Sequence, residues 1–168
     1  MINHFINGAA VAEGGCASDL FNPSNGSKIG TVLNGGADEL DLAAQAAHTA
    51  FQSWSTTGLG YRANVLLACR QQVMDHRDEL IEICVVEAGK TFADAAAEVD
   101  KGIEGLAYAA SVGSWLRSAT TQNVSSGIDV VDARYPIGVV TTVSPFNFPV
   151  MIPLVQAAMA LACGNTLV

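Results

Sequence analysis

The sequence predicts an α/β fold in which hairpins and helices lead into a strand–loop–helix unit of a parallel sheet. Short β-like runs separated by Gly, Asn and Pro turns occupy the first 33 residues. Apolar residues then recur with helical spacing from about residue 37 to about residue 116. A β-branched run at 137–143, a loop bounded by prolines and an apolar helix complete a pattern that is typical of an α/β fold.

The β-like runs are expected to form strands at residues 4–6, 9–12 and 28–33. Each run is bounded by Gly, Asn or Pro, which favour turns. We therefore expect a layer of hairpins ahead of the helices.

The first helix is expected at residues 37–54, with Leu42, Ala46, Ala50 and Phe51 on its inner face. Residues 61–88 are expected to form one long helix or two consecutive helices broken near residues 75–78. Gly89 then supplies the helix cap.

A further helix is expected from Thr91, which with Asp94 forms a start like a capping box. Its buried stripe runs to about residue 116 and comprises Phe92, Ala96, Val99, Ile103, Leu106 and Ala110. Residues 118–129 are polar and turn-prone, which taken alone predicts a loop or linker.

The last 34 residues, 135–168, are the most informative part of the sequence. The run from Ile137 to Val143 has the composition of a strand that is buried on both faces. Pro145 and Pro149 restrict the backbone of the loop that follows, Pro149 suits the first turn of a helix, and Gly164 supplies a left-handed cap. Open parallel sheets bind ligands beyond the carboxyl ends of their strands, so this loop is the expected functional site.

Motifs in this region resemble those of a known family. SPFNFP, preceded by YPIGVV and followed by a helix ending in CGNT, resembles the aldehyde dehydrogenase superfamily, and Phe146 with the MIP after the loop most resembles its methylmalonate-semialdehyde dehydrogenase branch. EAGK at residues 87–90 and FNPSNGSKIGTV at residues 21–32 resemble the E-x-GK turn and the N-terminal hairpin of that family. The resemblance spans nearly the whole chain and implies the N-terminal part of a Rossmann-type NAD-binding domain.

The resemblance also implies a division of the chain. Residues 1–120 would form the hairpin and helical part of the NAD-binding domain, residues 121–136 an oligomerisation arm, and residues 137–168 the first βα unit of the sheet. An arm strand is expected within residues 124–134 of a homo-oligomer, either a dimer or a tetramer, whereas the residues alone fit a solvated connector equally well. The catalytic domain of the family is expected to be absent from these residues.

The resemblance assigns roles to the loop residues. Val143, Ser144, Pro145 and Phe146 would line the NAD site, Phe148 would line the substrate, and Asn147 would be catalytic. Phe146 and Phe148 also suit packing. Asparagine also stabilises loops through local bonds between side chain and backbone, and the residues alone do not separate this role of Asn147 from the catalytic one.

The family's chemistry gives a reason for an amide at position 147. Attack of a thiolate on an aldehyde creates an oxyanion, and a fixed N–H donor stabilises that charge as it develops. Removal of one such donor typically raises the barrier by about 2.7–4 kcal/mol. A lysine could react with the aldehyde and an aspartate would repel the oxyanion, so a neutral donor is suitable.

The implied activity is NAD-dependent oxidation of a small aldehyde. Methylmalonate semialdehyde or malonate semialdehyde would give an acyl-CoA through a cysteine thiohemiacetal, with CoA or water releasing the acyl group. The alternatives are another semialdehyde dehydrogenase, or a truncated, non-catalytic remnant that binds nucleotide or associates with another subunit. The nucleophilic cysteine and base glutamate of the family lie downstream of Val168, so we expect no turnover by these 168 residues alone.

Composition narrows the range of partners. Eight basic and sixteen acidic residues give a net charge of −8, which argues against nucleic acid. Only 14% of residues are charged and 50% are hydrophobic, which suggests a surface covered by further segments or subunits.

The longest nearly apolar window, 150–163, is shorter than the roughly 20 residues of a membrane helix. No secretory signal is apparent, so we expect a cytoplasmic location, or a mitochondrial one after transit-segment removal in a eukaryote.

The four cysteines show neither CxxC pairing nor metal-ligand spacing, so no metal is expected. Cys69 and Cys84 are expected to be small core residues on helical faces. Cys163 lies next to a helix cap, but it has no neighbouring His or Glu in the sequence that would activate it. We expect it to be structural.

Overall fold

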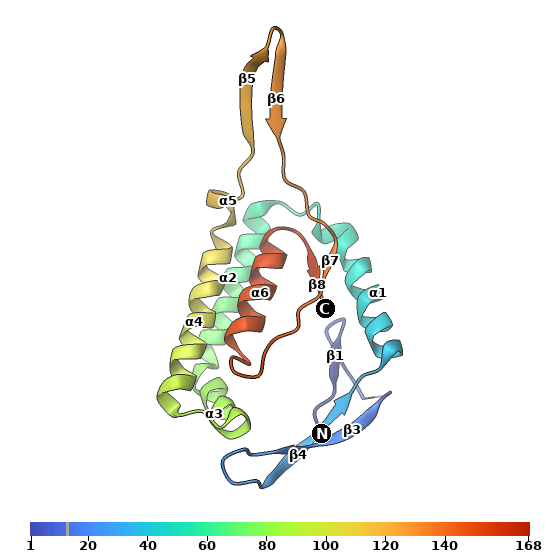
Figure 1. Ribbon diagram of the computed structural model, residues 1–168, viewed down its shortest axis with the longest axis vertical. Coiled ribbons are helices and arrows are strands. Elements are labelled where there is room, and N and C mark those ends of the chain that lie inside the picture. The colour runs from blue at the N-terminus through green and yellow to red at the C-terminus, as the bar shows by residue number, and fades with distance from the viewer. Residues whose placement is uncertain (13) are drawn as a thin grey trace.

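The computed structural model describes residues 1–12 and 14–168. N-terminal hairpins, a helical body and a projecting hairpin follow one another along the chain, and the C-terminal strand and helix return into the body (Figure 1).

Antiparallel hairpins open the fold. The first pairs β1 (His4–Ile6) with β2 (Ala9–Val11), and the second pairs β3 (Cys16–Phe21) with β4 (Lys28–Asn34). Asn7 and Gly8 connect β1 to β2 with φ of 53° and 76°, as in the type I′ turn that Asn-Gly favours. The strands expected at 4–6 and 28–33 are confirmed. The strand expected at 9–12 is also present, as β2, and ends at Val11. β3 was not predicted because its sequence, CASDLF, shows no alternation of apolar and polar residues.

The helical body begins with α1 (Ala37–Trp54), α2 (Leu59–Asp75), α3 (Arg77–Ala88), α4 (Phe92–Ala110) and the short α5 (Val112–Trp115). The first helix is confirmed at both ends. The expected break is confirmed at His76, and Gly89 ends α3 with φ of 66°. Thr91 Oγ1 accepts a bond of 3.1 Å from the Asp94 backbone N–H and so caps α4 as expected.

The inner face of α1 is narrower than expected. Ala47 is buried, whereas Leu42 is 48% exposed and Ala50 is exposed. The expectation for Leu42 and Ala50 was therefore wrong. The cause is that α1 packs along one side against β1 and against the strands near the C-terminus, so only a stripe of small residues around Ala47 is covered.

The predicted strand–loop–helix unit is confirmed. It consists of β7 (Val139–Val140), α6 (Met151–Ala162) and β8 (Thr166–Leu167), with β7 and β8 paired in parallel. Gly164, with φ of 89°, turns the chain from α6 into β8. The expectation that residues 137–143 form a strand buried on both faces was wrong: only Val139 and Val140 form the strand, both are half-buried, and Ile137 and Val143 are 87% and 89% exposed. α6 begins at Met151, so Pro149 lies in the turn before it.

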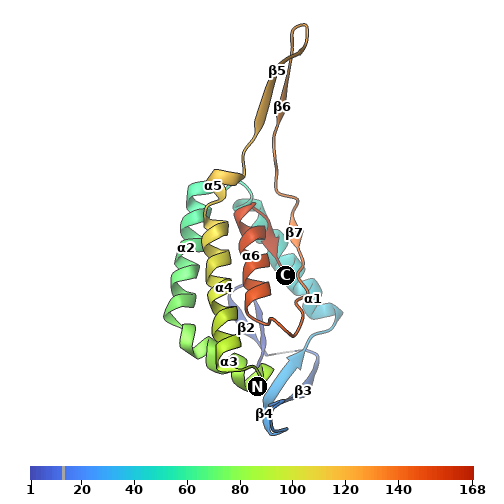
Figure 2. The same ribbon diagram turned by 60° about the vertical axis from the view of Figure 1, so that its left-hand side comes forward.

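The core lies between α2, α4 and α6, which run side by side in both views (Figures 1 and 2). One buried cluster joins these helices through Leu66, Leu106, Val112, Ala109, Ala158 and Ala162, and a second, towards α3, contains Ile81, Cys84, Ala95, Val99 and Ile103. The expected α4 stripe is confirmed at Val99, Ile103 and Leu106. The expectation that Phe92 is buried was wrong, because Phe92 is the first residue of the helix and is 62% exposed.

Glycines bring α4 and α6 close together. A Cβ atom at Gly105 would lie 2.4 Å from Val155 Cγ2, and one at Gly102 would lie 2.9 Å from Leu154 Cδ1. The missing side chains therefore allow α6, and the loop before it, to lie directly against α4. Within the described ranges no helix has both the length and the apolarity to cross a membrane.

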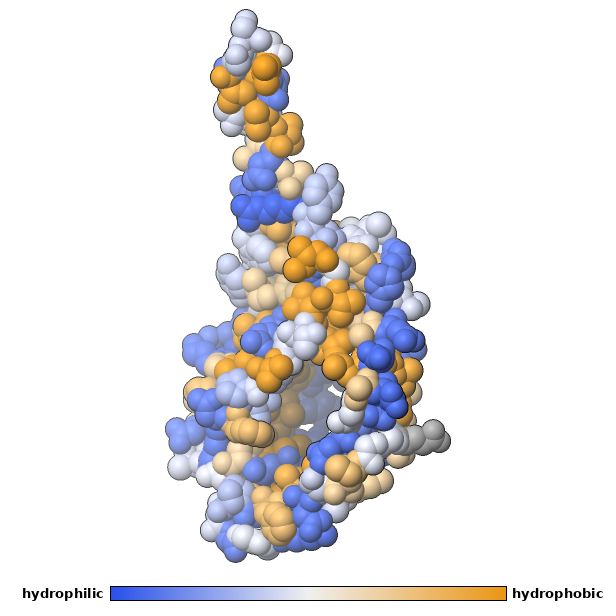
Figure 3. Space-filling model, turned by 45° about the vertical axis from the view of Figure 1, so that its right-hand side comes forward, coloured by the Kyte–Doolittle hydropathy of each residue, from blue (hydrophilic) through white to orange (hydrophobic). Residues whose placement is uncertain are grey.

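A hairpin of residues 119–132, which we call the arm, projects from the body (Figures 1 and 2). β5 (Ala119–Ser125) and β6 (Ile128–Asp132) pair antiparallel, and every residue of both strands is exposed. The loop or linker expected at 118–129 was therefore wrong, whereas the strand expected within 124–134 is confirmed as β6. The exposed apolar residues gather near the tip (Figure 3); they include Val124, Ile128, Val130 and Val131.

Candidate active site

The predicted site residues share one loop between β7 and α6: Val143, Ser144, Pro145, Phe146, Asn147 and Phe148. Val143 and Phe146 are 89% and 97% exposed, and the side chain of Asn147 is also exposed. Ser144 is half-buried. The loop leaves the carboxyl end of a parallel strand, which is where open sheets bind ligands.

The loop is anchored at both ends by backbone hydrogen bonds. Thr142 N donates to Val168 O at 2.9 Å, so the hydrogen bonding between the two strands continues past the ends of β7 and β8. Ile152 N donates to Phe148 O at 3.4 Å, where α6 begins. Asn147 lies in the turn between these anchors. The segment SPFNFPV contains neither a thiol nor an ionisable side chain, so its polar side-chain groups are the Ser144 hydroxyl and the Asn147 amide.

A buried carboxylate lies beneath the loop. The side chain of Glu98 on α4 is completely buried, and its Oε1 accepts bonds from Val150 N at 2.7 Å and Met151 N at 3.1 Å. These are N–H groups at the start of α6, which has no side-chain cap of its own because its N-cap residue is Val150. Sequence reasoning missed Glu98. The available signal was a glutamate within the apolar stripe of α4, beside Val99.

Lys90 pairs with this carboxylate. Its Nζ bonds to Glu98 Oε2 and lies 4.5 Å from the centre of the Phe148 ring, a cation–π contact. Burial acts to raise the pKa of Glu98, but the bonds from Lys90, Val150 and Met151 outweigh it, so the pKa lies below the ordinary value and the carboxylate is ionised at neutral pH. Lys90 belongs to the EAGK segment and Phe148 to the loop, so this pair joins two segments of the sequence resemblance.

The CGNT segment, residues 163–166, connects α6 to β8 and holds the strand–loop–helix unit together. Asn165 Oδ1 accepts bonds from Ile137 N at 2.7 Å and Gly138 N at 3.1 Å, which ties the chain entering β7 to the end of α6. Thr166 Oγ1 donates to Ala47 O at 2.8 Å, which ties β8 to α1. Both side chains are buried. The motif therefore serves to hold β7 in place.

The cysteines differ in their exposure. Cys84 is buried as expected, and burial raises the pKa of its thiol. The expectation that Cys69 is a small core residue was wrong, because its side chain is exposed on α2. Cys163 is half-buried at the end of α6. Among the described residues, no group of three or more His, Cys, Asp or Glu side chains could hold a metal ion.

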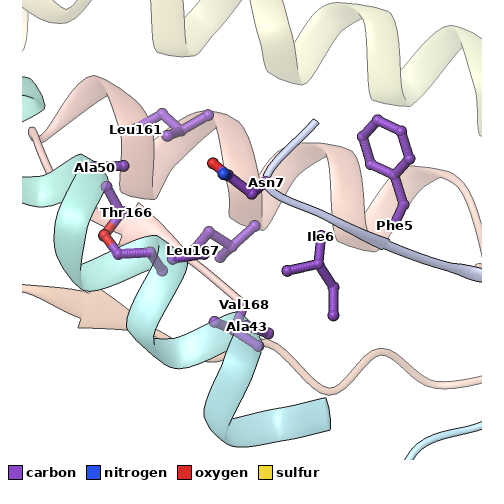
Figure 4. Close-up of a pocket in the computed structure, with 11 residues that line it drawn as sticks. Phe5, Ile6, Asn7, Ala43, Ala50, Leu161, Thr166, Leu167 and Val168 are labelled. Carbon is purple, nitrogen blue, oxygen red and sulfur yellow. The ribbon is translucent and has the colours of Figure 1, made fainter. Parts of the chain in front are cut away.

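An apolar cavity of about 490 Å³ lies beside β8, between β1, α1 and α6 (Figure 4). Its described lining residues include Phe5, Ile6, Leu161, Leu167 and Val168, and none of the described lining residues is ionisable. The close-up shows Leu167 and Val168 beside the side chains of α1 (Figure 4). This cavity suits packing of apolar side chains rather than chemistry.

The fold and the loop agree with one family of α/β enzymes. The model of the aldehyde dehydrogenase family matches residues 11–168, and the chain belongs to this family. The family resemblance of the sequence motifs is thereby confirmed.

Within the family, the chain is similar to malonate- and methylmalonate-semialdehyde dehydrogenases. It is 39% identical to the malonate-semialdehyde dehydrogenase of Pseudomonas aeruginosa over 167 residues, which cover 99% of this chain and 34% of that protein. The crystal structure of methylmalonate-semialdehyde dehydrogenase from Oceanimonas doudoroffii matches with a TM-score of 0.95 and 36% identity, again over 99% of this chain and 34% of that one. A putative methylmalonate-semialdehyde dehydrogenase from Sinorhizobium meliloti, complexed with NAD, matches with a TM-score of 0.93, 36% identity and the same coverage. The chain spans about a third of the length of these relatives.

Proposed function

We propose that this chain supplies the N-terminal part of an NAD-dependent dehydrogenase that oxidises malonate semialdehyde or methylmalonate semialdehyde. The observation that supports this most is the match of 99% of the chain, at a TM-score of 0.95, to a methylmalonate-semialdehyde dehydrogenase. We refer below to the protein with this activity as the complete enzyme.

In this proposal Asn147 donates its side-chain N–H to the oxyanion that forms when a thiolate attacks the aldehyde. Its exposed side chain in a turn anchored at both ends suits this role, because a donor held in place needs little reorganisation when charge develops. Phe148, the residue after Asn147, lines the substrate-binding site in this proposal.

The segment before Asn147 fits a nucleotide cofactor. The side chains of Val143 and Phe146 are apolar and almost fully exposed beyond the end of a parallel strand, and Ser144 and Pro145 lie between them. These four residues would hold NAD, which accepts the hydride of the oxidation. The pyrophosphate would be bound by residues other than these.

The acyl group would leave as a thioester of CoA or, with water as the acceptor, as an acid. The CoA-dependent course is the one we propose. Because the chain covers about a third of its relatives, we expect these 168 residues alone to be inactive. The second candidate is a non-catalytic protein that binds nucleotide or associates with another subunit.

We also propose that the protein forms a homo-oligomer, a dimer or a tetramer, through the arm. The arm exposes Val124, Ile128, Val130 and Val131 at 50–66% on strands whose residues are all exposed. Apolar side chains on an exposed hairpin are stabilised when another chain covers them.

The test is the intact mass of the purified native protein together with NAD reduction on methylmalonate semialdehyde, with and without CoA. A mass far above 17.4 kDa and CoA-dependent turnover is the expected result. A mass of 17.4 kDa without turnover would replace the proposal with the non-catalytic candidate.

A further inference from the structure

We propose that Glu98 and Lys90 form a clamp that positions Asn147, so that both act as positioning residues for the oxyanion donor. The clamp comprises the Glu98–Lys90 ion pair, its bonds to Val150 and Met151, and the contact of Lys90 with Phe148. This inference rests on the proposed function of Asn147.

The negative charge of Glu98 is buried. Glu98 is an ionised side chain without solvent contact in the apolar stripe of α4, next to Ala95 and Val99. An isolated buried carboxylate strongly disfavours folding, whereas one that is paired and hydrogen-bonded is tolerated. Here one carboxylate oxygen accepts two backbone N–H groups and the other takes the lysine. Every bond of this carboxylate therefore leads to the loop region or to Lys90.

The clamp contacts the chain directly after the proposed donor. Lys90 contacts the ring of Phe148, which directly follows Asn147, and Glu98 holds the N–H groups of the third and fourth residues after Asn147. On the N-terminal side of these contacts, the loop residues from Pro145 to Asn147 are exposed. The clamp thus contacts the chain at three of the first four residues on the C-terminal side of the donor.

The close packing of α4 against α6 brings Glu98 within hydrogen-bonding distance of the α6 N-terminus. A glutamate on α4 contacts the backbone of α6 because the two helices approach closely at Gly102, one turn after Glu98. A buried ion pair is not needed merely to hold two helices together, since apolar side chains do so equally well. Its directional bonds at this site instead fix the orientation of the α6 N-terminus and of the loop that enters it.

Two substitutions separate the parts of the clamp. Glu98→Gln keeps the size of the side chain and an acceptor oxygen, but it loses the charge and turns a donor towards Lys90. Lys90→Met keeps the length of the side chain and loses only the cation. Glu104→Gln is the matched control, because Glu104 lies on the same helix and bonds to Lys101 at 2.6 Å in an exposed pair.

The structural readout is amide hydrogen exchange of this chain by NMR, together with the side-chain amide signal of Asn147. Glu98→Gln should speed exchange at Val150 and Met151 by about 10-fold or more, as expected for weakened bonds to a charged acceptor, and should shift the Asn147 signal. Lys90→Met should shift the same signal, and Glu104→Gln should change neither. Unchanged exchange at Val150 and Met151 in Glu98→Gln would overturn the clamp.

The kinetic readout uses the complete enzyme. Glu98→Gln should lower kcat by about 10- to 100-fold, the scale of a misplaced catalytic group, with the KM for NAD changed less than about 2-fold. In an Asn147→Ala background the same substitution should have almost no further effect, because the donor that it positions is gone. A full additional loss in that background would show that Glu98 acts on general stability and would overturn the inference. An unchanged kcat in Asn147→Ala alone would instead overturn the proposed function, and the catalytic part of this inference with it.

Discussion

Replacement of Gly105 by alanine tests the close packing that holds α6, and with it the loop, against α4. The added Cβ would lie 2.4 Å from Val155 Cγ2, 3.4 Å from Val155 Cβ and 3.7 Å from Val155 Cα. A carbon–carbon contact of 2.4 Å is far inside the optimum of about 3.5–4.0 Å, so Val155 or the whole helix must move.

The magnitude follows from two opposing effects. Alanine favours a helix over glycine by about 1 kcal/mol. Overpacking by one methyl group typically destabilises by about 1–3 kcal/mol, and the upper half of this range applies here because valine is restricted to one main χ1 rotamer in a helix. We therefore expect Gly105→Ala to lower the free energy of unfolding by about 1–2 kcal/mol.

The assay is urea denaturation followed by far-UV circular dichroism, with Gly60→Ala as the matched control. Gly60 is also helical, in α2, and a Cβ there would meet no atom within 4 Å. Gly60→Ala should be neutral or stabilise by up to about 1 kcal/mol. If Gly105→Ala proves as stable as Gly60→Ala, the helices are not packed as closely as described and the reasoning is refuted.

Further predictions concern Glu98, Asn165 and the arm. The bonded Glu98 has a pKa below its ordinary value of 4.5, so its contribution to stability is complete above that pH and is lost as the pH falls through the lower folded-state pKa. The difference in unfolding free energy between the wild type and Glu98→Gln should therefore shrink as the pH is lowered from neutral to below 4.5, and a constant difference would be inconsistent with an ionised clamp. Asn165→Ala removes the acceptor of two backbone bonds and should destabilise by about 1–2 kcal/mol in thermal melts, whereas a change below about 0.5 kcal/mol would mean that water replaces it fully. Val131→Ser in the arm should reduce an oligomer to monomers in sedimentation experiments without altering circular dichroism, and an unchanged oligomer would exclude this contact.

The helices and the parallel unit could be predicted because their signals are local. Helical spacing of apolar residues gave α1 its correct ends, and Gly89, Thr91 and Gly164 marked caps that the structure contains. The strands β3 and β5 lack such a local signal. β3 and β5 are strands because each has an antiparallel partner, and their own residues show no alternation of apolar and polar side chains.

The position of the candidate loop was predictable, but its support was not. The prolines and the strand–helix order place Asn147 at the edge of the sheet, whereas Glu98 lies 49 positions away in the sequence and meets the loop only through the packing of α4 against α6. Burial faces depend on tertiary neighbours for the same reason. Leu42 and Cys69 have the spacing of core residues and are exposed, because no element covers their side of the helix in the described structure.

The most direct test of the proposed site is the turnover of Asn147→Ala in the complete enzyme. We predict that kcat falls by about 100- to 1,000-fold, which corresponds to the loss of one oxyanion donor, while NAD affinity changes less than about 2-fold. A kcat within about 3-fold of the wild type would contradict the assignment of Asn147 as the oxyanion donor and leave it a residue that only stabilises the loop.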